Sequence, residues 1–217
     1  MSDQDKSTAR LPDWADLVVH DCRGVLIVEG PSDSKYLRIA AETSNRLDLL
    51  DRLSVIAAGE GIDGPPTGGA ALVVRHAILF AATNKTPVVV LLDNDEVGLR
   101  AQDVLIAIGE KTGEWRRNAN VIGYHQAVDG PRSAPWEAED VWPDHLIDRF
   151  LDDDTNRAFE AGITELPFPA QRPRRELTGH GKGRFARFLQ NEASADDCVR
   201  WIRLLERVNE QFPERTS

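Results

Sequence analysis

Hydrophobic residues form two uninterrupted runs in the first half of the chain, and each run ends at acidic residues. The first occupies residues 24–29 and ends at Glu29, and the second occupies residues 87–92 and ends just before Asp93. Continuous stretches of Val, Ile and Leu are typical of parallel strands that are buried on both faces. The pattern therefore predicts two strands of one parallel sheet.

Further apolar segments alternate with stretches in which apolar residues recur at helical spacing, which indicates helices that bury one face. Strands are predicted at 24–29, 53–58, 87–92 and 120–124, and helices at 11–19, 34–45, 70–83 and 98–112. From residue 24 onward, this alternation is typical of a parallel sheet of about four strands flanked by helices, with right-handed crossovers. The fold class is therefore α/β.

The pattern changes after residue 125. A polar loop, an acidic stretch, a helix, a proline-rich irregular segment and two further helices are predicted at 126–136, 137–143, 144–151, 163–176, 179–193 and 196–211. We therefore expect a flexible N-terminal leader (1–13), an α/β core (14–125) and a mostly helical C-terminal extension that packs on the core (126–217).

Composition narrows the class of protein. With 217 residues, 41% hydrophobic and 29% charged, the chain matches a soluble globular protein, and no apolar run approaches the ~20 residues of a membrane helix. The lack of such a run predicts no membrane contact. Cys22 and Cys198 fit no metal or redox spacing, so we expect a reducing cytoplasm. The net charge of −10 disfavours tight non-specific binding to nucleic acid. It does not exclude a nucleic-acid substrate, because the acids of a metal site lower the net charge by themselves.

Four acids are predicted to meet at one edge of the sheet. Glu29 and Asp33 follow the first strand, and Asp93 and Asp95 follow the third. Ligand sites of open α/β sheets lie just beyond the carboxyl ends of the strands. Carboxylates that share one place repel each other unless cations neutralise them, and Mg²⁺ prefers carboxylate and water oxygens. This edge is therefore a candidate metal site.

Residues 24–125 resemble a toprim domain, the catalytic domain shared by topoisomerases, bacterial primases, ribosomal-RNA maturases and overcoming-lysogenisation-defect (OLD) nucleases. The matching residues are the Val28-Glu29-Gly30 turn, Asp33, the Asp93-Asn94-Asp95 turn and Gly98. Either motif alone is short, but both in this order after two buried strands are much rarer. The resemblance implies a toprim fold.

Within that family, the chain looks most like the OLD nucleases, because of IVEGPSD at 27–33 and EAEDVWPDHLIDRFL at 137–151. The resemblance implies a nuclease that cleaves DNA or RNA with two Mg²⁺ or Mn²⁺ ions. It assigns Glu29, Asp33, Asp93 and Asp95 to the metal site, adds Glu139 as a further acid, and gives Lys182 as the basic residue that assists cleavage. Glu29 is also a candidate general acid or base.

The same resemblance suggests a role in phage defence or DNA processing. OLD proteins usually carry an ATPase domain, and this sequence contains no Walker P-loop, so the chain is expected to act alone or with a separate ATPase partner. A homodimer is left open. The nucleic-acid substrate is expected to contact a basic stretch made of Arg172, Arg174, Arg175, Lys182, Arg184 and Arg187.

Simpler interpretations stand beside these. Each acid pair taken alone fits a solvated strand end or a helix cap, Glu139 fits an exposed acidic loop, and the Lys182 stem fits a cover over Phe185. Two other functions also stay open: a non-catalytic toprim-like module that binds nucleic acid or a partner, and a primase-like phosphotransfer enzyme. A receiver-type phosphoacceptor domain is disfavoured, because its acid pair belongs at the first strand.

Overall fold

A parallel sheet in the order β2–β1–β3–β4 forms the centre of the computed structural model, which describes residues 22–58, 69–84, 87–117, 119–165 and 173–212. The strands are β1 (Gly24–Val28), β2 (Leu53–Ala57), β3 (Val88–Leu92) and β4 (Val121–Gly123). The four-stranded parallel α/β sheet predicted from the sequence is thereby confirmed. The predicted strand ends differ from the observed ones by one residue at most.

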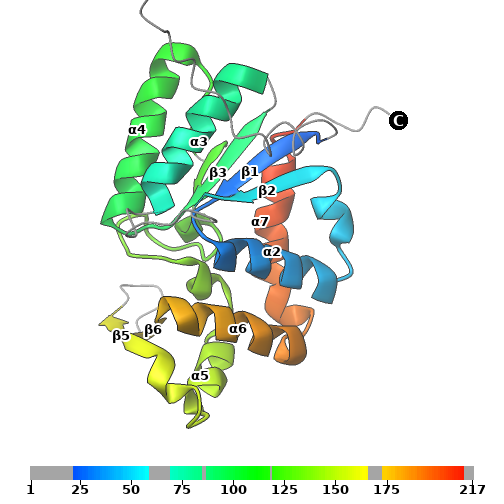
Figure 1. Ribbon diagram of the computed structural model, residues 1–217, viewed down its shortest axis with the longest axis vertical. Coiled ribbons are helices and arrows are strands. Elements are labelled where there is room, and N and C mark those ends of the chain that lie inside the picture. The colour runs from blue at the N-terminus through cyan, green and yellow to red at the C-terminus, as the bar shows by residue number, and fades with distance from the viewer. Residues whose placement is uncertain (1–21, 59–68, 85–86, 118, 166–172, 213–217) are drawn as a thin grey trace, which may run out of the picture.

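Helices cover both faces of the sheet (Figure 1). One face carries α3 (Gly69–Asn84) and α4 (Glu96–Thr112), and the other carries α2 (Pro31–Thr43) and α7 (Val199–Asn209). Successive residues of a strand point to opposite faces. Val25 and Ile27 accordingly pack with the α3–α4 side, whereas Leu26 and Val28 pack with the α2–α7 side. This two-sided burial explains why the strands are apolar without interruption.

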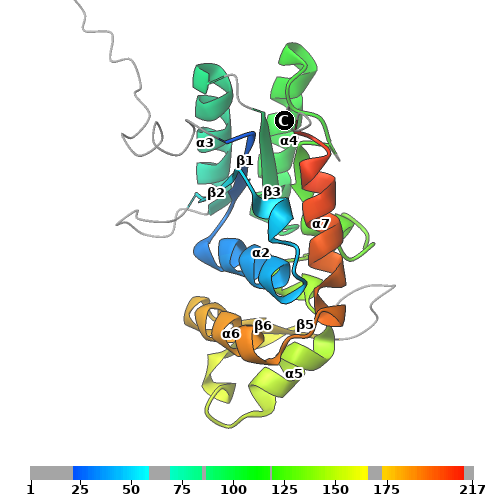
Figure 2. The same cartoon turned by 90° about the vertical axis from the view of Figure 1, so that its right-hand side faces the viewer.

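A smaller unit lies beyond the carboxyl ends of the strands (Figure 2). It contains α5 (Asp144–Asp152), α6 (Gly179–Glu192) and an antiparallel pair, β5 (Glu160–Glu165) and β6 (Pro173–Leu177). Short 3₁₀ turns occur at Leu47–Leu50, Tyr124–Gln126, Ala138–Val141, Arg157–Phe159 and Asp196–Cys198. This arrangement brings α6 next to α2 and to the sheet edge that the acids occupy.

The β5–β6 pair replaces much of the irregular segment that the sequence predicts at 163–176, so that prediction was wrong there. Proline disfavours the interior of a strand but is tolerated at its first residue, where Pro173 stands. The pair is reinforced by Arg175, whose guanidinium Nε lies 2.8 Å from Glu160 Oε1 on the opposite strand.

Aromatic rings join α7 to the rest of the core. The Trp201 ring lies 5.8 Å from the Tyr124 ring, 5.8 Å from the Trp142 ring and 6.1 Å from the Tyr36 ring, measured between centroids. The C-terminal helix therefore shares its core with the sheet. The predicted leader at 1–13 and the predicted helix at 11–19 lie outside the described residues, as do residues 59–68. No helix in the described part of the chain is long and apolar enough to span a bilayer.

Candidate metal centre

Glu29 ties the end of β1 to the end of β3. It directly follows β1, and its Oε1 accepts a hydrogen bond of 2.8 Å from the backbone N–H of Asp93. The start of α3 packs on the same residue: a Cβ added to Gly69 would lie 2.9 Å from the Glu29 carbonyl oxygen. Glycine at position 69 therefore permits the close approach of α3 to the strand end.

Asp33 lies in the first turn of α2, where the positive end of the helix favours a carboxylate. Its Oδ2 accepts a hydrogen bond of 2.8 Å from the Gly30 N–H, which fixes the turn between β1 and the helix. Pro31 begins the helix, a position at which its missing N–H costs nothing. Only 7% of Asp33 is exposed, so this carboxylate is held in a buried position at the edge.

Asp95 caps α4 from the other side of the edge. Its Oδ1 accepts a hydrogen bond of 2.6 Å from the Gly98 N–H, as expected of an N-cap aspartate. A Cβ on Gly98 would lie 2.2 Å from the Asp93 carbonyl oxygen. The glycine that follows the two acids is therefore needed for the turn to pack against the helix.

Asn94, between the two acids, holds the turn in place. It is 1% exposed, its N–H donates to the Trp136 carbonyl at 2.7 Å, and its Oδ1 accepts from the His125 N–H at 2.9 Å. Asn94 was not predicted to have a structural role. A buried amide that joins the ends of β3 and β4 to the loop before residue 137 leaves no recognisable sequence signal, because its partners are mostly backbone atoms.

The acidic stretch after β4 returns to the same edge and meets α6. Lys182 Nζ lies 3.0 Å from Glu139 Oε2 and 3.1 Å from Glu137 Oε2. The hydroxyl of Tyr36, on α2, donates to Glu139 Oε1 at 3.0 Å. Glu137 and Tyr36 were missed as site residues. The proximity of Glu137 to Glu139 in the sequence was a usable signal, whereas Tyr36 gave only the spacing of a core residue.

Burial and mutual repulsion dominate the electrostatics of the acids. Burial raises the pKa of Glu29 to about 7; the hydrogen bond from Asp93 opposes this rise, and the charge of Asp33 adds to it. Burial likewise raises the pKa of Asp33 to about 7, opposed by the Gly30 hydrogen bond and reinforced by the charge of Glu139. The pKa of Asp93 rises well above its usual range through burial and the charge of Glu29.

Lys182 is the cation among these acids. Burial alone would lower its pKa, but the charges of Glu139, Glu137 and Asp93 outweigh that effect and raise it. The ammonium group therefore stays charged. The structure thus brings together six predicted site residues, namely Glu29, Asp33, Asp93, Asp95, Glu139 and Lys182.

The carboxylate oxygens at this edge are the type of ligand that a hard divalent cation prefers. Oδ1 of Asp93 is buried and, within the described part of the chain, has no hydrogen-bond partner, so this oxygen is available to a cation. Oxygen donors of this type suit Mg²⁺ and Mn²⁺. Yet no three His, Cys, Asp or Glu side chains among the described residues are grouped closely enough to enclose an ion. Metal binding therefore requires carboxylate side chains to turn toward each other.

The described members of the basic stretch predicted to bind nucleic acid have different surroundings. Arg175 is engaged with Glu160 and Asp152, and Arg184 lies over the Phe159 ring at 4.9 Å. Arg187 is exposed on α6. Arg172 lies outside the described residues, and Arg174 is described only as part of the β6 backbone.

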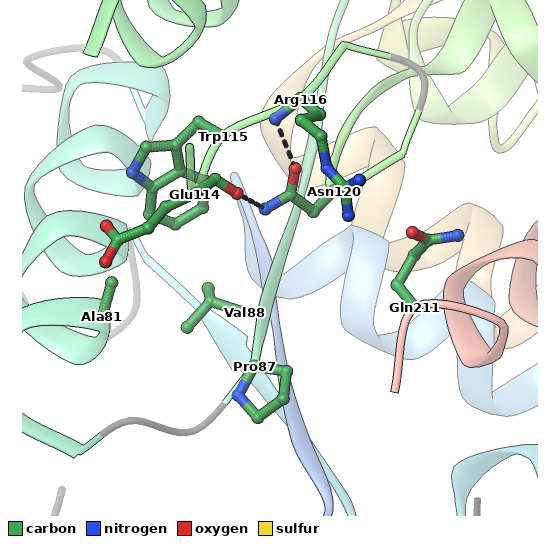
Figure 3. Close-up of a pocket in the computed structure, with 8 residues that line it drawn as sticks. All are labelled: Ala81, Pro87, Val88, Glu114, Trp115, Arg116, Asn120 and Gln211. Carbon is green, nitrogen blue, oxygen red and sulfur yellow. Dashed lines mark hydrogen bonds between the residues drawn. The ribbon is translucent and has the colours of Figure 1, made fainter. Parts of the chain in front are cut away.

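A separate hollow of about 270 Å³ opens at the amino ends of β3 and β4, opposite the acids (Figure 3). Its polar side chains are partly committed to the loop: Asn120 Oδ1 accepts from the Arg116 N–H at 2.6 Å, and its Nδ2 donates to the Glu114 carbonyl at 2.5 Å. Among the residues that line it, Glu114 is the one carboxylate. We therefore place the candidate site at the opposite edge, where several acids converge.

Comparisons of the chain with models of known protein families, with curated proteins and with solved structures found no match. The resemblance to toprim domains therefore rests on the chain's own residues, which are the Val28–Gly30 turn, Asp33 and the Asp93–Asp95 turn.

Proposed function

We propose that the chain is a toprim-type nuclease that hydrolyses phosphodiester bonds of DNA or RNA with divalent metal ions. One observation carries the proposal: Glu29 and Asp93, from two adjacent parallel strands, are joined by a hydrogen bond at the carboxyl edge of the sheet. Asp33 lies in the first turn of α2 and Asp95 is the N-cap of α4, the helices that follow those strands. The sheet order, the placement of the acids and their sequence motifs together support this assignment.

The acids would hold the ions, and the remaining groups would handle charge and protons. Candidate ligands are Glu29, Asp33, Asp93, Asp95 and Glu139. A bound Mg²⁺ or Mn²⁺ supplies an activated water and neutralises charge on the phosphate. Tyr36 positions Glu139 through its hydrogen bond and is therefore a positioning residue.

Hydrolysis forms a bond between the water oxygen and phosphorus and breaks the bond to the leaving oxygen. With a pKa of about 7, Glu29 is suited to take the proton of the attacking water, because a base poised near the working pH is most effective. The leaving oxygen then receives a proton from solvent or from the same carboxyl. Lys182 neutralises the negative charge that develops on the phosphate.

The same resemblance is the basis for proposing a separate ATPase partner and a role in phage defence or DNA processing. These proposals rest on the motifs at Glu29 and Asp93, and no contact of the described residues bears on them.

The test is a cleavage assay with purified protein. Wild type and Asp93→Asn are incubated with supercoiled plasmid, linear duplex, single-stranded DNA and RNA, each in Mg²⁺, Mn²⁺ or EDTA. We expect metal-dependent cleavage by wild type and a loss of at least about 100-fold in the variant, since removal of one electrostatic group from an active site costs 10²–10³. Cleavage that continues in EDTA or in the variant would contradict the proposal.

A second candidate function, a nucleic-acid-binding module without turnover, is favoured by one observation. Lys182 already neutralises Glu137 and Glu139 through ion pairs, so these two acids do not need a metal ion to balance their charge. The same assay separates the two functions: the binding module shifts the mobility of a substrate but cleaves none of them with either metal.

A further inference from the structure

Helices α2 and α6 lie side by side and run in the same direction (Figure 1). A hollow of about 180 Å³ opens between them, which we call the α2–α6 groove. Its lining consists of Lys35, Arg38, Ile39, Gly183, Ala186, Arg187 and Gln190. Three of these residues are cationic, and none is acidic.

The three cations of the groove are exposed and uncommitted. Lys35, Arg38 and Arg187 have no ion pair with any acidic side chain of the described residues. By contrast, Arg175 and Arg132 are bound to neighbouring carboxylates. In a chain with a net charge of −10, an acid-free group of three cations is a local exception that ion pairing does not explain.

The groove and the candidate metal centre are built on the same two helices. Asp33 stands two residues before Lys35 on α2, and Lys182 directly precedes Gly183 on α6. With a rise of 1.5 Å per residue, Arg38 and Arg187 lie about 7.5 Å along their helices from Asp33 and Lys182. Phosphates of one strand are spaced by about 3.4 Å along a duplex axis, so this length corresponds to roughly two phosphates.

The floor of the groove is open. Ala186 and Gly183 are small, and a Cβ added to Gly183 would meet no atom within 4 Å. A phosphate can therefore approach the helix closely while the long cationic side chains reach it from both sides. Acidic ligands other than a phosphodiester chain would fill the same hollow, but they would not extend toward the carboxylates.

We propose that the α2–α6 groove binds the phosphate backbone of a nucleic acid strand and leads it to the carboxylates at the sheet edge. This inference deepens the proposed nuclease function and names Lys35 and Arg38, together with Arg187, as substrate-binding residues. The contact is electrostatic and independent of base sequence, as expected of backbone phosphates.

The test measures binding without cleavage. A short fluorescein-labelled single-stranded DNA or RNA is titrated in EDTA at several KCl concentrations, with fluorescence anisotropy as the readout. The groove variant is Arg38→Gln/Arg187→Gln. The matched control is Arg200→Gln/Arg203→Gln, which removes the same charge from exposed positions of α7.

We expect the groove variant to bind about tenfold more weakly than wild type, and its slope of log K against log salt to be smaller by about 1.4, because each lost phosphate contact removes about 0.7 from a single-strand slope. The control keeps the wild-type slope. Equal affinity and slope in the groove variant, or no binding by wild type, would overturn the proposal.

A second pair of variants tests the floor without removing a cation. Gly183→Glu places a carboxylate in the groove and should weaken binding as strongly as the double variant, whereas Gly183→Gln, which adds similar bulk without the charge, should weaken it less. Equal binding by both would overturn the groove. Because the readout is in EDTA, weakened binding supports the groove even if wild type cleaves nothing, and cleavage with unaltered groove-variant binding supports the nuclease alone.

Discussion

At the scale of single residues, Asp95 has two separable roles. It caps α4 through a hydrogen bond from the Gly98 N–H, and it contributes a negative charge to the edge where Glu29 lies. A serine hydroxyl can cap a helix about as well as an aspartate, but it carries no charge. Substitution at this position can therefore separate the helix cap from the proposed metal binding.

We predict that Asp95→Ser folds with nearly wild-type stability but binds Mn²⁺ at least tenfold more weakly. Asp95→Ala should lose the cap as well and be destabilised by about 1 kcal/mol. Urea denaturation reports the first property and isothermal titration calorimetry the second. If Asp95→Ser binds Mn²⁺ as wild type does, Asp95 is only a helix cap.

Glu29 and Asp33 make the metal-free protein sensitive to pH. The pKa of each is raised to about 7 in the folded chain, mainly by burial, from unfolded values near 4. The folded state therefore binds more protons between these values. Stability from these two groups is fully present below about pH 4 and is lost as the pH rises toward 7, by up to about 1.4 kcal/mol per pH unit for each proton.

We predict that the double variant Glu29→Gln/Asp33→Asn loses less stability than wild type as the pH rises toward 7. The measurement is the free energy of unfolding from urea curves between about pH 4.5 and 7.5, in EDTA. The pKa of His125 is lowered to about 4, chiefly by burial, so this histidine adds stability as the pH rises. The difference between wild type and variant removes that opposite effect. Parallel pH profiles of the two proteins would contradict the raised carboxylate pKa values.

At the scale of elements, the junction of β3 and α4 depends on Gly98. We predict that Gly98→Ala destabilises the protein by about 1–3 kcal/mol, because the added methyl overlaps the Asp93 carbonyl and must displace the turn. Gly183→Ala on α6 is the control: nothing lies within 4 Å of its Cβ, and alanine favours a helix interior by about 0.5–1 kcal/mol over glycine. Thermal unfolding of both variants measures the contrast, and an unchanged Gly98→Ala would contradict the close packing.

The sequence was most informative where burial is two-sided. The apolar runs that precede Glu29 and Asp93 predicted β1 and β3, because both faces of these strands are covered by helices. The β5–β6 pair was missed, because Pro173 and the surrounding charged residues resemble a loop and only the pairing across the strands stabilises them. Similarly, Asn94 could not be recognised, since its partners become adjacent only after folding.

The candidate site also has a part that could be predicted from the sequence and a part that could not. Strand ends and helix starts are local features, so Glu29, Asp33, Asp93 and Asp95 could be placed at one edge from the order of elements alone. The approach of Lys182 to Glu137 and Glu139 joins residues more than 40 positions apart, so it could not be inferred from sequence spacing. Resemblance to a family suggested Lys182, and the fold supplies the contact.

At the scale of the whole molecule, Trp201 couples the C-terminal helix to the site. Its ring packs on Tyr36, which holds Glu139, and on Tyr124 at the end of the sheet. We predict that Trp201→Ala lowers the free energy of unfolding by about 3–5 kcal/mol. Val199→Ala on the same helix, at a position that is 42% exposed, should stay within about 0.5 kcal/mol of wild type. Equal stability of both variants in urea would contradict a shared core.

Calorimetric titration of Mn²⁺ into wild type and into Asp93→Asn tests the central claim most directly, namely that the acidic edge of the sheet holds divalent metal ions. We predict saturable binding by wild type, with an affinity that rises with pH through 7 because Glu29 and Asp33 must release protons. Asp93→Asn should bind Mn²⁺ at least about 100-fold more weakly. Mutation of residues that only support a metal ligand already lowers metal affinity by up to about 100-fold. Identical heats from the two proteins would show that the acids at this edge do not form the metal centre.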